Sequence, residues 1–179
     1  MADHLTAKSV AGAILAPVGE FPRDLLEELS LRAHLKIAPA LVDPGAALSP
    51  ARRQYDSTRL LIAIKERYPG TLVVGATECD LYIPVLTFIF GEAEMPGRAA
   101  IFSIHRLREE FYGLPGNREL LAARALRELR HEYGHLHGLA HCQDWSCVMS
   151  SSHSVELVDA KGDSYCLECD KRMRGNAAR

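Results

Sequence analysis

The chain has 179 residues, of which 47% are hydrophobic and 25% are charged, and its formal net charge at pH 7 is -2. This composition is typical of a globular protein with one domain and excludes a disordered or collagen-like chain. The charges form no block of one sign that would predict non-specific nucleic-acid binding, and no apolar run reaches the roughly 18 residues that a membrane span requires.

The first apolar run has two interpretations. Residues 9–18 follow Lys8, as the core of a signal peptide would, but Asp3 and the lack of a basic cluster favour a buried β-strand. On the favoured interpretation the protein is cytoplasmic, and no inhibitory pro-segment fits ahead of a first strand that begins near residue 9.

Hydrophobic periodicity and turn residues predict alternating strands and helices up to Gly138. The expected strands are residues 9–15, 35–41, 71–75, 84–90 and 99–104. The expected helices are residues 22–35, 51–68 and 118–137, with a loop at 43–50 and a turn at 91–97. This order predicts an α/β fold with a mixed sheet. We expect a single domain, residues 1–179, in which an α/β part (1–138) carries a small irregular part (139–179).

Four of the eight histidines lie in residues 131–141, which read HEYGHLHGLAH. Helix residues four apart share a face, so His131 and His135 can bind one metal ion. A straight helix would carry His141 out of reach, but Gly138 can adopt a positive φ and turn the chain back, which makes His141 the third ligand. Three imidazoles leave the fourth position of a zinc ion to water, as a catalytic site requires.

Glu132 lies about 100° around the helix from His131, at the flank of the face that carries the metal ligands. Its expected role is that of a general base, which takes a proton from the water at the metal and passes it to the leaving amine. A solvated helix glutamate is the alternative. His137 falls at the edge of the apolar stripe, so we expect it to pack and not to bind metal.

Four of the five cysteines form two closely spaced pairs near the carboxyl end: Cys142 with Cys147, and Cys166 with Cys169. Four thiolates suit a closed structural zinc site, which would stabilise a segment that has few large apolar residues. Two disulfides are the alternative and need an oxidising compartment. Because Cys142 follows His141 directly, we expect the cysteine site to anchor the third histidine. The fifth cysteine, Cys79, is expected to be a small buried apolar residue.

The pattern H-E-x-x-H-x-x-G-x-x-H, followed by a methionine, resembles the metzincin metalloproteases. Its extension through Cys142-x4-Cys147-x-Met149 and Cys166-x2-Cys169 resembles the archaemetzincins in particular. The resemblance implies a metzincin-like twisted mixed sheet with backing and active-site helices, two zinc ions and peptide-bond hydrolysis with Glu132 as base. It also implies that Met149 lies beneath the zinc ligands. An edge strand is expected to bind the substrate as an added antiparallel strand, and residues 84–90 are its best candidate.

Some metzincins have a tyrosine two residues after this methionine, where this chain has Ser151. Tyr165 and His153 are therefore the candidates for stabilising the oxyanion. The favoured function is a zinc-dependent peptidase, of undetermined endo- or aminopeptidase type, which is monomeric and acts on peptides or proteins without a nucleic-acid or membrane partner. One alternative is a catalytically weak or inactive zinc-stabilised protein that binds peptides. The other is a nucleic-acid-binding zinc module. Glu132 favours the peptidase, because a binding protein needs no base beside its metal.

Overall fold

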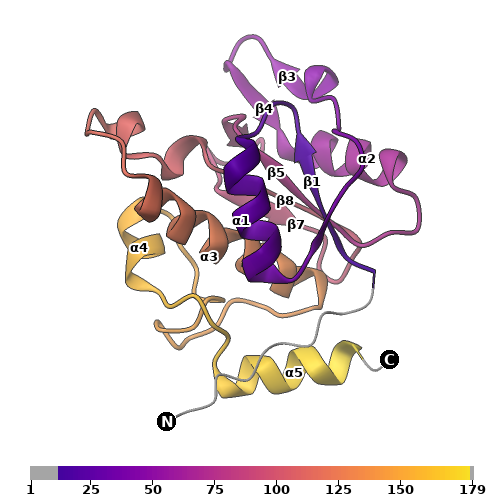
Figure 1. Cartoon of the computed structure of the whole chain (residues 1–179), viewed down its shortest axis with the longest axis vertical. Coiled ribbons are helices and arrows are strands. Elements are labelled where there is room, and N and C mark those ends of the chain that lie inside the picture. The colour runs from indigo at the N-terminus through magenta and orange to yellow at the C-terminus, as the bar shows by residue number, and fades with distance from the viewer. Residues whose placement is uncertain (1–11, 178–179) are drawn as a thin grey trace.

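A five-stranded sheet forms the centre of the computed structural model, which describes residues 12–177 (Figure 1). Its strand order is β2-β1-β5-β8-β7. Four strands run parallel: β1 (Ile14–Val18), β2 (Lys36–Ile37), β5 (Val73–Thr77) and β8 (Ala99–Ser103). The edge strand β7 (Gly91–Ala93) is antiparallel to β8. The mixed α/β sheet expected from the sequence is thus confirmed.

A smaller sheet covers one end of the central sheet. It consists of β3 (Leu48–Ser49), β4 (Gln54–Asp56) and β6 (Leu81–Tyr82), in the order β3-β4-β6. Short 3-10 helices complete the connections at Gly45–Ala47, His105–Leu107 and Glu109–Tyr112.

Helices pack on both faces of the central sheet (Figure 1). On one face α1 (Arg23–Ala33) and α3 (Arg118–Leu136) bury apolar side chains such as Leu29 and Leu129 against Phe102. On the other face α2 (Ser57–Arg67) buries Leu60 and Ile64 against the sheet. Each such side chain stabilises the fold by about 1.5–3 kcal/mol. Alternate residues of each strand therefore face different cores, as a sheet buried on both faces requires.

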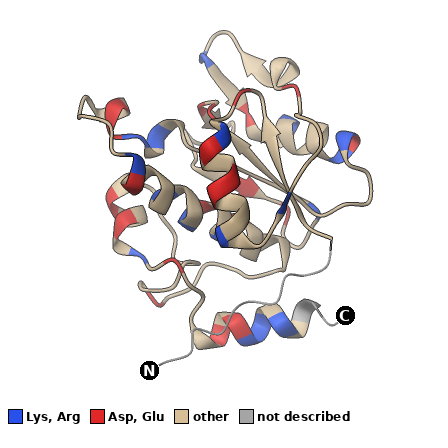
Figure 2. Cartoon of the chain, viewed as in Figure 1, with Lys and Arg blue, Asp and Glu red and all other residues tan. Residues whose placement is uncertain are grey.

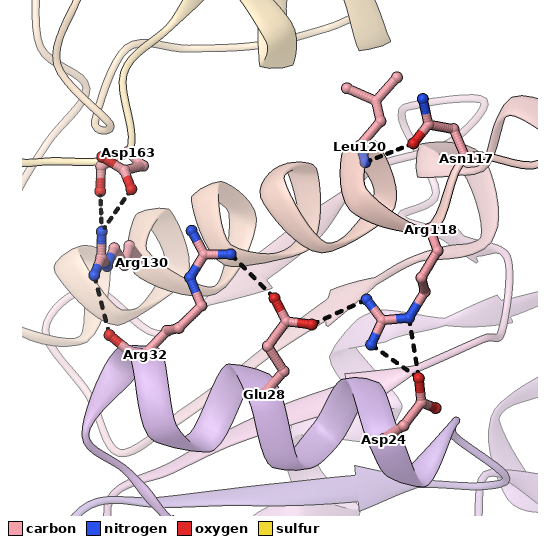
Figure 3. A network of polar contacts seen from close by, with 8 residues as sticks. All are labelled: Asp24, Glu28, Arg32, Asn117, Arg118, Leu120, Arg130 and Asp163. Carbon is pink, nitrogen blue, oxygen red and sulfur yellow. Dashed lines mark hydrogen bonds and ion pairs between the residues drawn. The ribbon is translucent and has the colours of Figure 1, made fainter.

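Polar contacts connect α1, α3 and the carboxyl-terminal segment (Figure 3). Arg118 donates two hydrogen bonds to Asp24, which lowers the pKa of that carboxyl, and also pairs with Glu28. Arg130, the residue directly before His131, donates to the carbonyl of Asp163 at 2.6 Å. The contacts of Arg118 join α1 to the start of α3, and the contact of Arg130 with Asp163 joins the end of α3 to the carboxyl-terminal segment.

The carboxyl-terminal segment is more regular than expected. It contains α4 (Val155–Ala160) and α5 (Leu167–Ala177), although its sequence predicts an irregular structure. The α4 helix is too short to show periodicity, and it buries Val155 and Val158 in the core beneath α1 and α3. The acidic residues lie in the first turn of α5 and the basic residues follow them (Figure 2), and they form ion pairs four residues apart, Glu168 with Arg172 and Asp170 with Arg174.

Two further predictions are corrected. The helix expected at 51–68 begins only at Ser57, because Gln54–Asp56 pairs as strand β4 and the Asp56 carboxylate then caps α2 by accepting the Arg59 N–H at 3.2 Å. The strand expected at 84–90 is a turn and an extended connection, and the edge strand follows it, within the predicted turn at 91–97. The reason is local: the Leu86 N–H bonds to the Ile83 carbonyl and closes a turn around Pro84.

The first strand is shifted relative to its prediction. It runs over Ile14–Val18, while residues 9–11 of the prediction lie outside the described residues. The strand continues through Pro17, whose carbonyl accepts the Val42 N–H at 2.9 Å. Between residues 12 and 177, no helix combines the length and the apolar character needed to cross a membrane.

Candidate active site

The end of helix α3 brings the three histidines of the sequence motif together. The helix ends at Leu136, and Gly138 adopts the left-handed conformation, with φ 78°. The N–H groups of Gly138 and Leu139 donate to the carbonyls of His135 and Gly134, a pattern known as a Schellman motif. The turn expected at Gly138 is thus present, and the chain after it folds back toward the helix.

The histidine rings face one another. The ring centroid of His141 lies 5.2 Å from that of His131 and 5.0 Å from that of His135. One ligand nitrogen from each ring lies within 4.8 Å of the others. The Nδ1 atoms of His131 and His135 point away, toward the carbonyls of Val148 and Leu139, at 2.9 and 2.7 Å. In the tautomer with the proton on Nδ1, each ring donates to its carbonyl, and its Nε2 lone pair faces the centre of the group.

This donor set fits a zinc ion. The Nε2 atoms of His131 and His135 are 3.1 Å apart, and two lone pairs at that distance repel each other unless a cation lies between them. Two nitrogens bound tetrahedrally to one Zn²⁺ are separated by roughly 3.3 Å. Burial, followed by the charge of Lys161, lowers the pKa of His131 to about 2, and burial lowers that of His135. Both rings are therefore neutral, as metal ligands must be.

Glu132 is buried beside these rings. Only 4% of its surface is exposed, and burial raises the pKa of its carboxyl well above the ordinary value, with the charge of Glu128 as the second cause. Its side chain lies against the backbone of β7 at Gly91. The sequence suggests a glutamate at the flank of the ligand face. The structure instead encloses this carboxyl between the helix and the edge strand.

A buried ion pair lies next to the histidines. The Nζ atom of Lys161 is 2.9 Å from Oε1 of Glu128, and the two side chains are only 1% and 4% exposed. The angles between these atoms are not those of a hydrogen bond, so the attraction is electrostatic. Nζ also lies 3.4 Å from the Ser150 carbonyl and 3.5 Å from Nδ1 of His131. The pair thus joins α3 to the chain that follows α4.

Met149 lies beneath the helix turn that carries the histidines. It is fully buried, and a Cβ atom at Gly134 would collide with its Sδ atom. Tyr165 packs in the same cluster and donates its hydroxyl to the Arg130 carbonyl at 2.6 Å. Since its hydroxyl is engaged outside the cleft, Tyr165 is not placed to stabilise an oxyanion there, whereas His153 lines the cleft.

The four clustered cysteines form a second group of donors. Their Sγ atoms all lie within 4.8 Å of one another, and those of Cys142 and Cys166 are 3.8 Å apart. Four sulfurs bound tetrahedrally to Zn²⁺ are separated by roughly 3.8 Å, so the donor set and its spacing fit this ion. The Cys142 N–H donates to the Met149 carbonyl at 3.0 Å, and the backbone N–H of Cys169 lowers the pKa of the Cys166 thiol.

Two predicted non-ligands lie apart from these donors. The fifth cysteine, Cys79, is half-buried against the core beneath α2. His137 is buried with its ring against Tyr133.

A cleft of about 520 Å³ contains the histidine group. Its lining includes the apolar connection before β7, with Leu86, Phe88 and Phe90, and a polar segment, with Ser151, Ser152 and His153. Glu132 and the ion pair of Glu128 and Lys161 also line the cleft. The cleft therefore places a neutral imidazole cluster and a buried carboxyl along one edge of the sheet.

Sequence reasoning missed several residues of this cleft. Glu128 lies three residues before His131 and therefore on the same helix face, which is a signal that the sequence does contain. Gly134 in mid-helix is a second signal. A glycine there lowers helix stability, so its presence indicates that a neighbouring group approaches the helix closely. No sequence signal marks Lys161 or Gly91, because tertiary packing alone brings them to the site.

Known proteins resemble this chain in sequence. The sequence model described as "Peptidase family M54" matches residues 52–175. The archaemetzincin of Methanocaldococcus jannaschii is 40% identical over 165 residues, or 89% of this chain and 91% of that protein. The archaemetzincin of Pyrococcus furiosus is 40% identical over 182 residues, or 93% and 94% of the two chains.

Solved structures agree with the sequence comparisons. The crystal structure of an archaemetzincin from Methanopyrus kandleri matches with a TM-score of 0.84 and 32% identity, and it covers 98% of this chain and 100% of its own. A zinc-dependent peptidase from Methanocorpusculum labreanum matches with a TM-score of 0.78 and 27% identity over 90% and 100% of the two chains. These matches confirm the resemblance found in the sequence and the α/β metzincin-like fold. The chain belongs to peptidase family M54 with the archaemetzincins, and it is a zinc metallopeptidase.

Proposed function

We propose that this peptidase cleaves peptide bonds with Glu132 as general base, at a catalytic zinc ion held by His131, His135 and His141. One observation carries the proposal: two imidazoles, each oriented through Nδ1, direct Nε2 atoms at one another 3.1 Å apart in the cleft that contains the buried Glu132 carboxyl. A zinc ion bound there supplies a Lewis acid that polarises a carbonyl and lowers the pKa of water.

The chain's own residues perform the proton transfers. The Glu132 carboxylate takes a proton from the attacking water and later gives it to the leaving amine, so that one water and one peptide bond become an acid and an amine. Burial raises the pKa of this carboxyl, which favours both the uptake and the transient retention of the proton. The carbonyls of Val148 and Leu139 hold the ligand rings in one orientation throughout.

The substrate is a peptide or protein segment. It extends along β7 as an added strand, where backbone pairing supplies affinity and pockets between alternate side chains supply specificity. The edge position of β7 at the cleft supports this arrangement. The apolar wall formed by Leu86 and Phe88 favours substrates with a large apolar side chain near the scissile bond.

A second, structural zinc ion is held by four cysteines: Cys142, Cys147, Cys166 and Cys169. These residues carry a small apolar cluster of their own with Val148 and Met149, so this ion stabilises the segment that carries His141. We propose that residues 1–179 act as one catalytic domain with subdomains 1–138 and 139–179. The insertion of Val155 and Val158 of α4 into the main core supports the union of the two.

The experiment combines metal analysis with hydrolysis. The zinc-loaded protein should contain two zinc ions per chain, and the His131→Ala/His135→Ala variant should contain one. The wild type should cleave members of a peptide library. Glu132→Ala should lose nearly all of this activity while keeping both ions, and Glu66→Ala, on the exposed face of α2, serves as the matched control. A wild type that binds peptides without cleaving them, or an active Glu132→Ala variant, would contradict the proposal.

A further inference from the structure

We propose that Gly91, the first residue of edge strand β7, is a positioning residue that holds the Glu132 carboxylate in its reactive place. This inference rests on the proposed role of Glu132. The Glu132 side chain lies flat against the α-carbon of Gly91: a Cβ atom at position 91 would be only 2.7 Å from both Cγ and Cδ of Glu132 and would also collide with Oε1. A methyl group at residue 91 and the present position of this carboxylate exclude each other.

The backbone itself does not require this glycine. Gly91 is absent from the residues with positive φ, so its conformation is open to any L-residue. It is paired with Phe102 of β8 in a regular antiparallel register, without a turn or a change of direction. The glycine is therefore explained by what lies over it, which is Glu132.

The strand cannot move away from Glu132, because its other face is anchored. The next residue, Glu92, points toward the amino terminus of α2, where its carboxylate accepts hydrogen bonds from the hydroxyls of Ser57 and Thr58, the latter at 3.0 Å. A negative charge at the amino end of a helix is also stabilised by the helix dipole. The Ser103 N–H, which donates to the Phe90 carbonyl at 2.8 Å, fixes the strand from β8.

Glu132 has little room on the helix side either. The residue is 4% exposed, and the like charge of Glu128 lies nearby on the same helix. A side chain at residue 91 would therefore push the carboxylate along the cleft by about 1 Å, the difference between 2.7 Å and an ordinary contact. Misplacement of a catalytic group by about 1 Å can lower a rate by about 100-fold. Gly91 thus acts through Glu132, without touching the substrate bond itself.

The test is the variant Gly91→Ala in the zinc-loaded enzyme. We expect kcat to fall about 100-fold, while KM and the zinc content stay within about twofold of the wild type. The side chain of Glu132→Asp is shorter by one methylene group and leaves room for a Cβ atom at residue 91. The double variant Gly91→Ala/Glu132→Asp should therefore be at least as active as the single variant Glu132→Asp. Gly175→Ala on α5 is the matched control, because a Cβ atom there meets nothing within 4 Å. An unchanged kcat, or a rise in KM alone, would overturn the inference.

A second measurement does not depend on activity. In the metal-free protein, Gly91→Ala should lower the melting temperature, and the same substitution should cost little in a Glu132→Ala background, where the obstructing side chain is gone. Equal losses in both backgrounds would show that residue 91 does not act through Glu132. If the wild type proves inactive but the two substitutions affect the melting temperature non-additively, the contact between residues 91 and 132 stands. The proposed function is then refuted, and so is the role of Gly91 in positioning Glu132 for catalysis.

Discussion

Lys161→Met removes one charge of the buried pair beside the histidines and leaves the other. The Nζ atom of Lys161 is 2.9 Å from Oε1 of Glu128, and both side chains are nearly inaccessible. At that distance the attraction is about 6 kcal/mol for an effective dielectric constant of about 20. Much of it offsets the desolvation of the two ions, yet removing one partner leaves the other charge buried and unpaired. We expect the free energy of unfolding to fall by about 3–5 kcal/mol.

Urea unfolding at a fixed free zinc concentration measures this loss, since bound metal adds to the apparent stability. The double variant Lys161→Met/Glu128→Met should recover most of the loss, because no uncompensated charge then remains. Lys171→Met on the exposed surface of α5 is the control and should change stability by less than about 0.5 kcal/mol.

A loss below about 1 kcal/mol for Lys161→Met would mean that water screens the pair, and the electrostatic reasoning would be refuted. The same holds if the double variant is less stable than both single variants.

Three further outcomes follow from the site. Met149→Ala should cost about 2–5 kcal/mol in urea unfolding, because a fully buried side chain leaves a cavity beneath the histidines. The metal-free chain should lose stability as the pH falls below about 6.5, by up to about 1.4 kcal/mol per pH unit for His131: its pKa is about 2 when folded, so only the unfolded chain takes up the proton. Urea unfolding in EDTA at several pH values measures this loss, and His131→Asn should show a flatter dependence of the free energy of unfolding on pH. Cys166→Ser with Cys169→Ser should weaken zinc binding at the histidines through His141, and an unchanged zinc titration would defeat that coupling.

Several parts of the fold could be predicted from periodicity. Helix α3 appears at Arg118–Leu136 against an expected 118–137, and β8 at Ala99–Ser103 against 99–104. Both are long or strongly apolar segments with clear ends, and for these the local pattern suffices. The predictions failed where segments are short: α4 has six residues and β7 three, which is too few to show a period. Both are held by contacts with distant parts of the chain.

The candidate site divides in the same way. Spacing along one helix and one glycine turn determined that His131, His135 and His141 converge, because a helix repeats every 3.6 residues and Gly138 can adopt positive φ. Only the tertiary structure decided which groups surround them. Lys161 reaches the site from the far end of α4, and Gly91 reaches it because β8 pairs with the edge strand. Such neighbours depend on the packing of segments remote in sequence, which no local periodicity encodes.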